Sequence, residues 1–183
     1  MDIALLILRV VVGGALTAHG AQKLFGWFGG AGLTGTGAWF ETIGFRPGVA
    51  FALLAGATEV SGGVCFALGL FGPFPSALIL AVMVVAVVTV HVGRGFFASN
   101  NGVELPLLYI TGAVVIAFAG PGVISLDSLL GLDARLQRVP GWLALAVGLM
   151  AALGNVVIRR PPPQISLQRQ APAADDDVMR ARR

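Results

Sequence analysis

Apolar residues dominate the chain in five long segments separated by short stretches rich in glycine, proline or polar residues. The segments span residues 3 to 22, 48 to 71, 75 to 92, 104 to 119 and 141 to 158. Segments of about 20 apolar residues match the hydrocarbon core of a bilayer. Because a backbone in lipid must satisfy its own hydrogen bonds, this length and continuity predict helices. The pattern therefore predicts an all-α membrane protein built as a bundle of transmembrane helices.

The composition indicates that most of the chain lies in lipid. The 183 residues are 56% hydrophobic and only 11% Asp, Glu, Lys or Arg, whereas soluble domains carry about 25% charged residues. Nucleic-acid binding is not expected, because six of the twelve basic residues lie in the last 25 positions and form no stripe on a folded face. The single cysteine, Cys65, excludes an intrachain disulfide, a CxxC pair and a zinc site, and we expect no metal. Any redox chemistry must therefore come from a bound cofactor or a partner protein.

Two connecting regions carry signals of their own. Residues 24 to 47 contain six of the fifteen aromatic residues, whose rings favour the headgroup level, so this loop is either an aromatic belt or a lid over a site. The six are Phe25, Trp27, Phe28, Trp39, Phe40 and Phe45. Residues 126 to 138 place leucines opposite charged side chains, which predicts a short helix on the membrane surface. The charged side chains are Asp127, Asp133, Arg135 and Arg138.

The chain after the fifth segment is polar and rich in proline. Residues 159 to 183 have no apolar periodicity, which predicts a disordered basic tail. With five spans, the six tail arginines share one side of the membrane with Lys23, Arg46 and Arg94. The positive-inside rule then predicts an external N-terminus and a cytoplasmic C-terminal tail. We expect a multi-pass protein of the plasma membrane.

Ionisable side chains within spans are costly and normally face the bundle interior. Arg9 and Glu59 fall on helix faces rich in small residues, and their estimated depths differ by only about 4 Å at 1.5 Å of rise per residue. We therefore predict an ion pair between Arg9 and Glu59. Such a pair either fixes the helix register or serves as a charge relay to a site.

Polar side chains also gather at the ends of the first and third segments. His19 and His91 end these two segments on the same side of the membrane. Gln22, Lys23 and Glu104 lie on that side too. Hydrogen-bonding and titratable groups beneath aromatic rings suit a quinone headgroup. The alternative is that these are polar helix ends in contact with water and headgroups. A haem with His19 and His91 as axial ligands is not expected, because many membrane haem sites carry their ligands deeper and no further histidine is present for a second haem.

Several stretches of the sequence resemble the DoxX family of small membrane proteins. The resemblance covers residues 3 to 130 and is carried by residues 18 to 30 (AHGAQKLFGWFGG), by Leu8-Arg9 with Gly13, by Glu59 with Gly62-Gly63, by His91 with Gly95-Phe96-Phe97, and by residues 101 to 107 (NGVELPL). It implies a core domain of four transmembrane helices over residues 1–130, whereas the linker and fifth transmembrane helix expected over 131–158 and the tail over 159–183 lie outside it. It also implies membership of membrane redox assemblies, including quinone-linked oxidation of sulfur compounds. Family members often carry an aromatic residue where this chain has Leu105.

The sequence therefore predicts a membrane subunit of a quinone-linked oxidoreductase assembly, which supplies an anchor and a quinone-headgroup site. The electron carriers would belong to a redox partner protein, and the sequence leaves open whether this chain is itself an enzyme. Membrane lipid and a homo- or hetero-oligomer are the other expected partners. Two alternatives stay open: a non-catalytic scaffold that recruits a soluble redox protein through its tail, and a small transporter.

Overall fold

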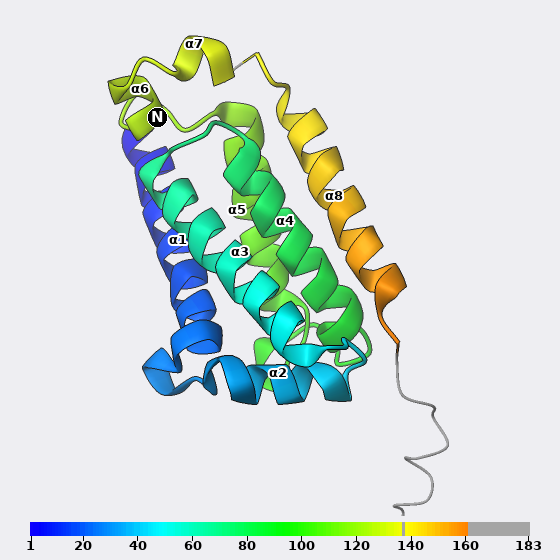
Figure 1. The fold of residues 1–183 in the computed structure, drawn as a ribbon. Coiled ribbons are helices and arrows are strands. Elements are labelled where there is room, and N and C mark those ends of the chain that lie inside the picture. Colours follow the sequence, from blue (N-terminus) through cyan, green and yellow to red (C-terminus); the bar gives the residue numbers. More distant parts are fainter. Residues whose placement is uncertain (137, 161–183) are drawn as a thin grey trace, which may run out of the picture.

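The computed structural model describes residues 1–136 and 138–160, and over these residues its regular structure is entirely helical. The long helices run side by side with alternating directions (Figure 1). They are α1 (Asp2–Phe25), α3 (Gly48–Leu68), α4 (Phe74–Ala86) with a π-helical turn (Val87–His91), α5 (Glu104–Ala119) and α8 (Gly141–Ile158). The predicted all-α membrane bundle is confirmed, and the expected spans agree with these helices to within a few residues.

Four helical segments of the described chain are long and apolar enough to cross a membrane: α1, α3, residues 74–91 and α8. The protein is therefore a multi-pass membrane protein. α5 is apolar but has 16 residues, so its length of about 24 Å at 1.5 Å per residue is below the bilayer core of about 30 Å. It packs on α4 and also contacts α1 and α8.

Short helices cover the two ends of the bundle. α2 (Gly32–Thr42) lies across the lower end in Figure 1, where it packs on α3 and α1. α6 (Leu126–Leu129) and α7 (Asp133–Leu136) lie at the opposite end. The first loop thus folds back over the bundle, and the surface helix expected over residues 126–138 is two separate short helices.

Glycines set the contact between α1 and α3. Gly13 lies against Gly63 and Ala67, and a Cβ at Gly13 would stand only 2.5 Å from the Gly63 carbonyl oxygen. About two turns further along α1, a Cβ at Gly20 would stand 2.8 Å from both the Gly56 carbonyl oxygen and the Val60 backbone nitrogen. Because neither helix has room for a side chain here, the two backbones approach closely and their register is fixed.

A buried carboxylate joins α6 to the α3–α4 hairpin. The Asp127 carboxylate accepts hydrogen bonds from the backbone N–H groups of Phe71 (2.9 Å) and Gly72 (2.6 Å), and Asp127 is only 1% exposed. Asp127 was expected on the charged outer face of a surface helix, so that placement is wrong. The backbone N–H groups of Phe71 and Gly72 in the tight hairpin need acceptors, and the inward-facing carboxylate supplies them.

The buried Arg9 belongs to this same end of the molecule. One Nη of its guanidinium donates to the Ile124 carbonyl, and Asp127 is the neighbouring negative charge. Gly69 adopts a left-handed conformation (φ +66°), and a Cβ there would collide with the Arg9 guanidinium. The chain reversal after α3 therefore leaves room for the arginine.

The expected disordered tail falls mainly on residues 161–183, outside the described residues. Its cytoplasmic location stays a prediction.

The glycine contact makes a paired test possible. We expect Gly13→Ala to lower the free energy of unfolding by about 1–3 kcal/mol, because the added methyl group overpacks the α1–α3 interface. Gly14→Ala should leave it unchanged or raise it slightly, since a Cβ at Gly14 meets nothing within 4 Å and alanine favours helix. Unfolding of the two purified variants by denaturing detergent compares them directly. Equal effects would show that the helices do not meet at Gly13.

The buried carboxylate gives a second prediction. Asp127→Ala should lower the free energy of unfolding by about 2–4 kcal/mol, because two buried N–H groups lose their acceptor. Asp133→Ala, at a less buried carboxylate on the neighbouring α7, is the control and should change it by less than about 0.5 kcal/mol. The same detergent unfolding assay measures both, and a control as unstable as Asp127→Ala would contradict the account.

Candidate functional site

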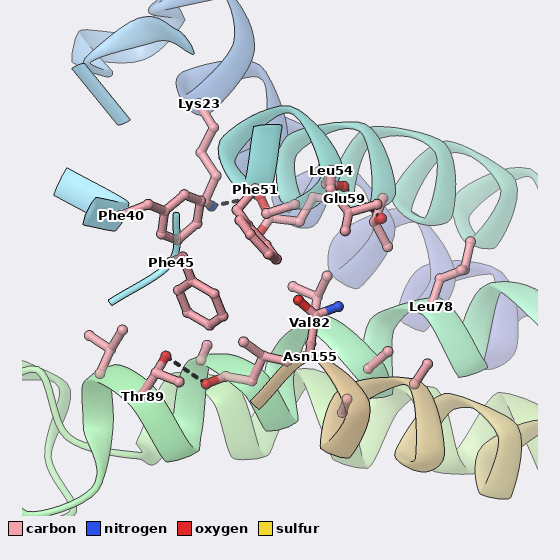
Figure 2. A pocket seen from close by; sticks show the side chains of 18 of the residues that line it. Lys23, Phe40, Phe45, Phe51, Leu54, Glu59, Leu78, Val82, Thr89 and Asn155 are labelled. Carbon is pink, nitrogen blue, oxygen red and sulfur yellow. Dashed lines mark hydrogen bonds and ion pairs between the residues drawn. The ribbon is translucent and has the colours of Figure 1, made fainter. Parts of the chain in front are cut away.

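A cavity of about 330 Å³ lies near the α2 end of the bundle. Its walls come from α3, α4 and α8, and the α2 region closes it at one end (Figure 2). Small and aliphatic side chains, such as Ala55, Ala81 and Val82, make up most of the walls. The polar lining residues are Lys23, Thr58, Glu59, Thr89, His91 and Asn155. The cavity is thus a half-open apolar pocket with polar groups from several helices.

Aromatic rings close the α2 end of the cavity. Trp39 and Phe40 come from α2, Phe45 from the following loop and Phe51 from α3. Successive rings are in contact, with centroids 5.4 Å apart for Trp39–Phe40, 5.7 Å for Phe40–Phe45 and 5.1 Å for Phe45–Phe51. Phe45 is only 2% exposed. This part of the loop covers the site.

The other aromatics of the same loop are exposed. Phe25, Trp27 and Phe28 are each more than half exposed and none of them is among the cavity-lining residues. Their exposure matches an aromatic belt at the membrane interface. The two interpretations of the loop therefore apply to different halves of it.

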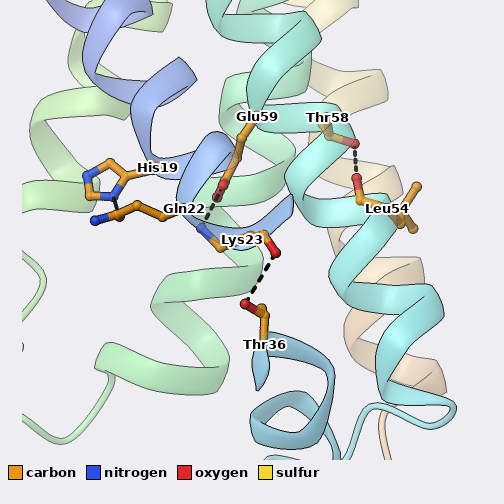
Figure 3. Close-up of polar contacts among 7 residues, drawn as sticks. All are labelled: His19, Gln22, Lys23, Thr36, Leu54, Thr58 and Glu59. Atoms are coloured by element: carbon orange, nitrogen blue, oxygen red, sulfur yellow. Dashed lines mark hydrogen bonds and ion pairs between the residues drawn. The ribbon is translucent and has the colours of Figure 1, made fainter. Parts of the chain in front are cut away.

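A buried ion pair lies at the cavity wall. Lys23 Nζ and Glu59 Oε2 are 2.6 Å apart, and the Glu59 side chain is 5% exposed against 25% for Lys23 (Figures 2 and 3). The predicted Arg9–Glu59 pair is therefore wrong, because Glu59 pairs with Lys23, whereas the Arg9 guanidinium lies near Asp127. Glu59 still faces the bundle interior, as its small-residue face predicts.

The register of α1 and α3 explains this correction. Gly20 lies against Gly56 and Val60, so Glu59 stands near the level of residues 17–21 on α1. Arg9 is about ten residues further along, or about 15 Å at 1.5 Å per residue. Lys23 is one turn beyond that level in the other direction, and its long side chain extends back to the carboxylate.

The π-helical turn at the end of α4 forms part of the wall. Val92 N donates to Val87 O (2.8 Å), the i to i−5 pattern of a π-helix, and Thr89 and His91 lie within the turn. Such turns occur frequently at functional sites. The His91 Nδ1 lies 2.6 Å from the Asn101 carbonyl oxygen, which orients the ring.

The remaining predicted site residues lie elsewhere. His19 Nδ1 is 3.2 Å from Gln22 Oε1, and the Gln22 amide donates to Phe28 O (3.2 Å). Figure 3 shows this pair on the side of α1 away from the Lys23–Glu59 pair. Glu104 accepts a hydrogen bond from Ala98 N (2.7 Å) and so holds the loop before α5. Of the five predicted ligand-binding residues, only Lys23 and His91 line the cavity.

Sequence reasoning missed Asn155 and the wall made by α8. The predicted site rested on ionisable groups, and an amide is not ionisable. Asn155 is nevertheless a polar residue within an apolar helix, which is the signal that would have found it. The aromatic Phe51 and the threonines carried no comparable signal.

The arrangement suits a flat, largely apolar ligand with a few polar atoms. Ligand cavities of about 300–1,000 Å³ with apolar walls and few placed polar groups are typical small-molecule sites. Aromatic rings provide flat packing surfaces, and Lys23, His91 and Asn155 provide donors.

Comparisons with known proteins find related sequences in bacteria. An uncharacterized protein of Haemophilus influenzae is 34% identical over 131 residues, which cover 68% of this chain and 88% of that protein. A UPF0756 membrane protein of Paenibacillus is 37% identical over 90 residues, covering 48% of this chain and 56% of that protein. The chain thus spans little more than half the length of the Paenibacillus protein. No solved structure matches the chain.

The family comparison covers the helices that carry the ion pair. The model of the DoxX family matches residues 4–92, which run from α1 through the π-helical turn after α4. This stretch includes Lys23, Glu59, His91 and the aromatic layer. The protein belongs to the DoxX family.

Proposed function

We propose that the protein is a plasma-membrane subunit of a quinone-linked oxidoreductase assembly and that the cavity holds the quinone headgroup. The observation that carries this proposal is a 330 Å³ apolar cavity with an aromatic layer at one end and the Lys23–Glu59 pair in its wall. A quinone ring is flat and apolar and carries two carbonyl oxygens, so the residues present fit it. When bound, a quinone supplies two-electron, two-proton redox chemistry.

The lining residues take distinct roles in this proposal. The Lys23 ammonium donates to a carbonyl oxygen, and Glu59 holds the ammonium at the cavity wall through the 2.6 Å contact. His91 lines the same cavity, and its imidazole nitrogens can donate or accept a hydrogen bond. Phe45 and Phe51 pack against the ring and exclude water.

The predicted residues outside the cavity support it indirectly. His19 and Gln22 hold the turn that begins the first loop, because the Gln22 amide bonds to Phe28 O. Glu104 holds the loop that presents Asn101 to His91. We therefore propose that these three residues position the site without contacting the quinone.

Charge distribution supports a cytoplasmic location for the α2 end. Lys23 ends α1 there, and Arg159 and Arg160 follow α8 at the same end (Figure 1). Arg135 lies in α7 at the opposite end. An excess of basic residues marks the cytoplasmic side of the membrane.

Blocking the cavity tests the proposal. We expect the wild-type protein, purified in mild detergent, to carry quinone at a near-stoichiometric ratio, measured by solvent extraction and mass spectrometry. Ala55→Phe should reduce that ratio at least tenfold, because the ring fills the cavity. Ala57→Phe is the matched control on the exposed face of α3 and should leave the ratio unchanged.

The outcomes separate the alternatives. Background quinone in the wild-type protein, with no quinone taken up on titration, would contradict the proposal and favour a scaffold role. Equal loss in both variants would show that the quinone is held elsewhere on the protein. Size-exclusion profiles confirm that each variant remains folded.

A further inference from the structure

The cavity wall made by α8 lies outside the stretch that the family model matches. The DoxX match ends at residue 92, whereas α8 begins at Gly141. α8 contributes Ala151, Ala152 and Asn155 to the cavity. Asn155 is the polar member of this group. Any ligand recognition by Asn155 therefore comes from a part of the chain outside the matched region.

We propose that the Asn155 amide donates a hydrogen bond to a ligand carbonyl and so selects carbonyl-bearing rings over hydrocarbon rings of similar shape. This inference rests on the proposed function, because it assigns a recognition group to the quinone cavity. An amide in an apolar span is unfavourable without a hydrogen-bond partner. Its position in the wall of a cavity points to a ligand as that partner.

The Asn155 side chain faces the cavity. Figure 2 shows its amide projecting from α8 toward Val82, on the side across from Lys23. The residue is half-buried, and the neighbouring Ala152 is only 1% exposed, so this face of α8 is turned to the protein. By contrast, Val157 on the same helix is 83% exposed and faces outward.

Other polar groups that line the cavity already have protein partners. The Thr58 hydroxyl donates to Leu54 O (2.7 Å), and the Thr89 hydroxyl donates to Val85 O (2.8 Å). The charged Lys23 and Glu59 bind each other. Within residues 1–136 and 138–160, the Asn155 amide makes no hydrogen bond. Its donor and acceptor atoms are therefore free for a ligand.

Two sets of contacts hold α8 in place. Gly148 packs directly on the Ala77 backbone of α4, where a Cβ would collide with the carbonyl. At the other end, Arg160 N donates to Gly44 O (2.8 Å), and the Arg159 side chain donates to Ile43 O. These bonds tie α8 to the loop that carries Phe45. The contacts that hold α8 thus lie both before and after Asn155 along the chain.

Two donors from different walls suit a ring with two carbonyl groups. Lys23 comes from the α1–α3 side and Asn155 from the α8 side. A charged ammonium attracts any anion or acceptor, whereas a neutral amide donates a directional hydrogen bond to a ketone-type oxygen. Asn155 therefore provides discrimination that the lysine alone does not.

Binding of two ligands that differ in their carbonyls tests the inference. A decyl-substituted benzoquinone is titrated into the purified full-length protein, and quenching of tryptophan fluorescence gives its Kd. Decylbenzene, which has the same tail without carbonyls, is measured by its competition against the quinone. For Asn155→Leu we expect quinone affinity to fall about five- to tenfold, because a buried carbonyl loses its donor. Decylbenzene affinity should stay within twofold.

The controls distinguish failure of the inference from failure of the proposed function. Val157→Ala, on the outward face, should leave both affinities unchanged, and Asn155→Ala should repeat the quinone-specific loss if Asn155→Leu does not fold. No quinone binding by the wild-type protein would overturn the proposed function and this inference with it. Quinone binding that is unaffected by Asn155→Leu, or an equal loss for both ligands, would overturn the inference alone.

Discussion

The close approach of α1 and α3 determines how the polar groups of this protein meet. Gly13 and Gly20 on one helix lie against Gly63 and Gly56 on the other, so the two backbones have one permitted register. That register brings Lys23 to Glu59 and leaves Arg9 at the opposite end of the bundle. In lipid, an ionisable group without a partner is costly. The glycine contact therefore decides which charges can be buried and where the cavity acquires its polar wall.

The two ends of the bundle use buried charge differently. At one end, Asp127 accepts hydrogen bonds from the α3–α4 hairpin beside Arg9, and Asp127 and Arg9 are each only 1% exposed. At the other end, Lys23 and Glu59 border a cavity large enough for a ligand. The first arrangement joins helices and loops, whereas the second presents a charged group to an apolar chamber. Under the proposed function, stability and ligand binding belong to separate ends of a small fold.

The sequence predicted the helices well because each is a long apolar run bounded by glycine, proline or charge. It also predicted that Glu59 faces inward, since its neighbours on the helix are small. The ion-pair partner of Glu59 could not be predicted, because the depth of a residue in the membrane was estimated from the midpoint of its segment. That estimate ignores the helix register that the glycine contacts between α1 and α3 impose. Asp127 was misplaced for a related reason: a periodic charged face does not reveal which side chain will meet unpaired N–H groups. The proposed role of Asn155 depends on α8 lying against α4, which no local pattern encodes.

The most direct test of a quinone cavity in this position is photo-crosslinking with an azido-quinone, followed by mapping of the labelled peptides by mass spectrometry. The account predicts labels on the cavity walls, within residues 51–59, 78–91 and 151–155. Labelling should decrease when unmodified quinone is added in excess. Labels concentrated instead around His19, Gln22 and Glu104, or labelling that excess quinone does not reduce, would contradict it.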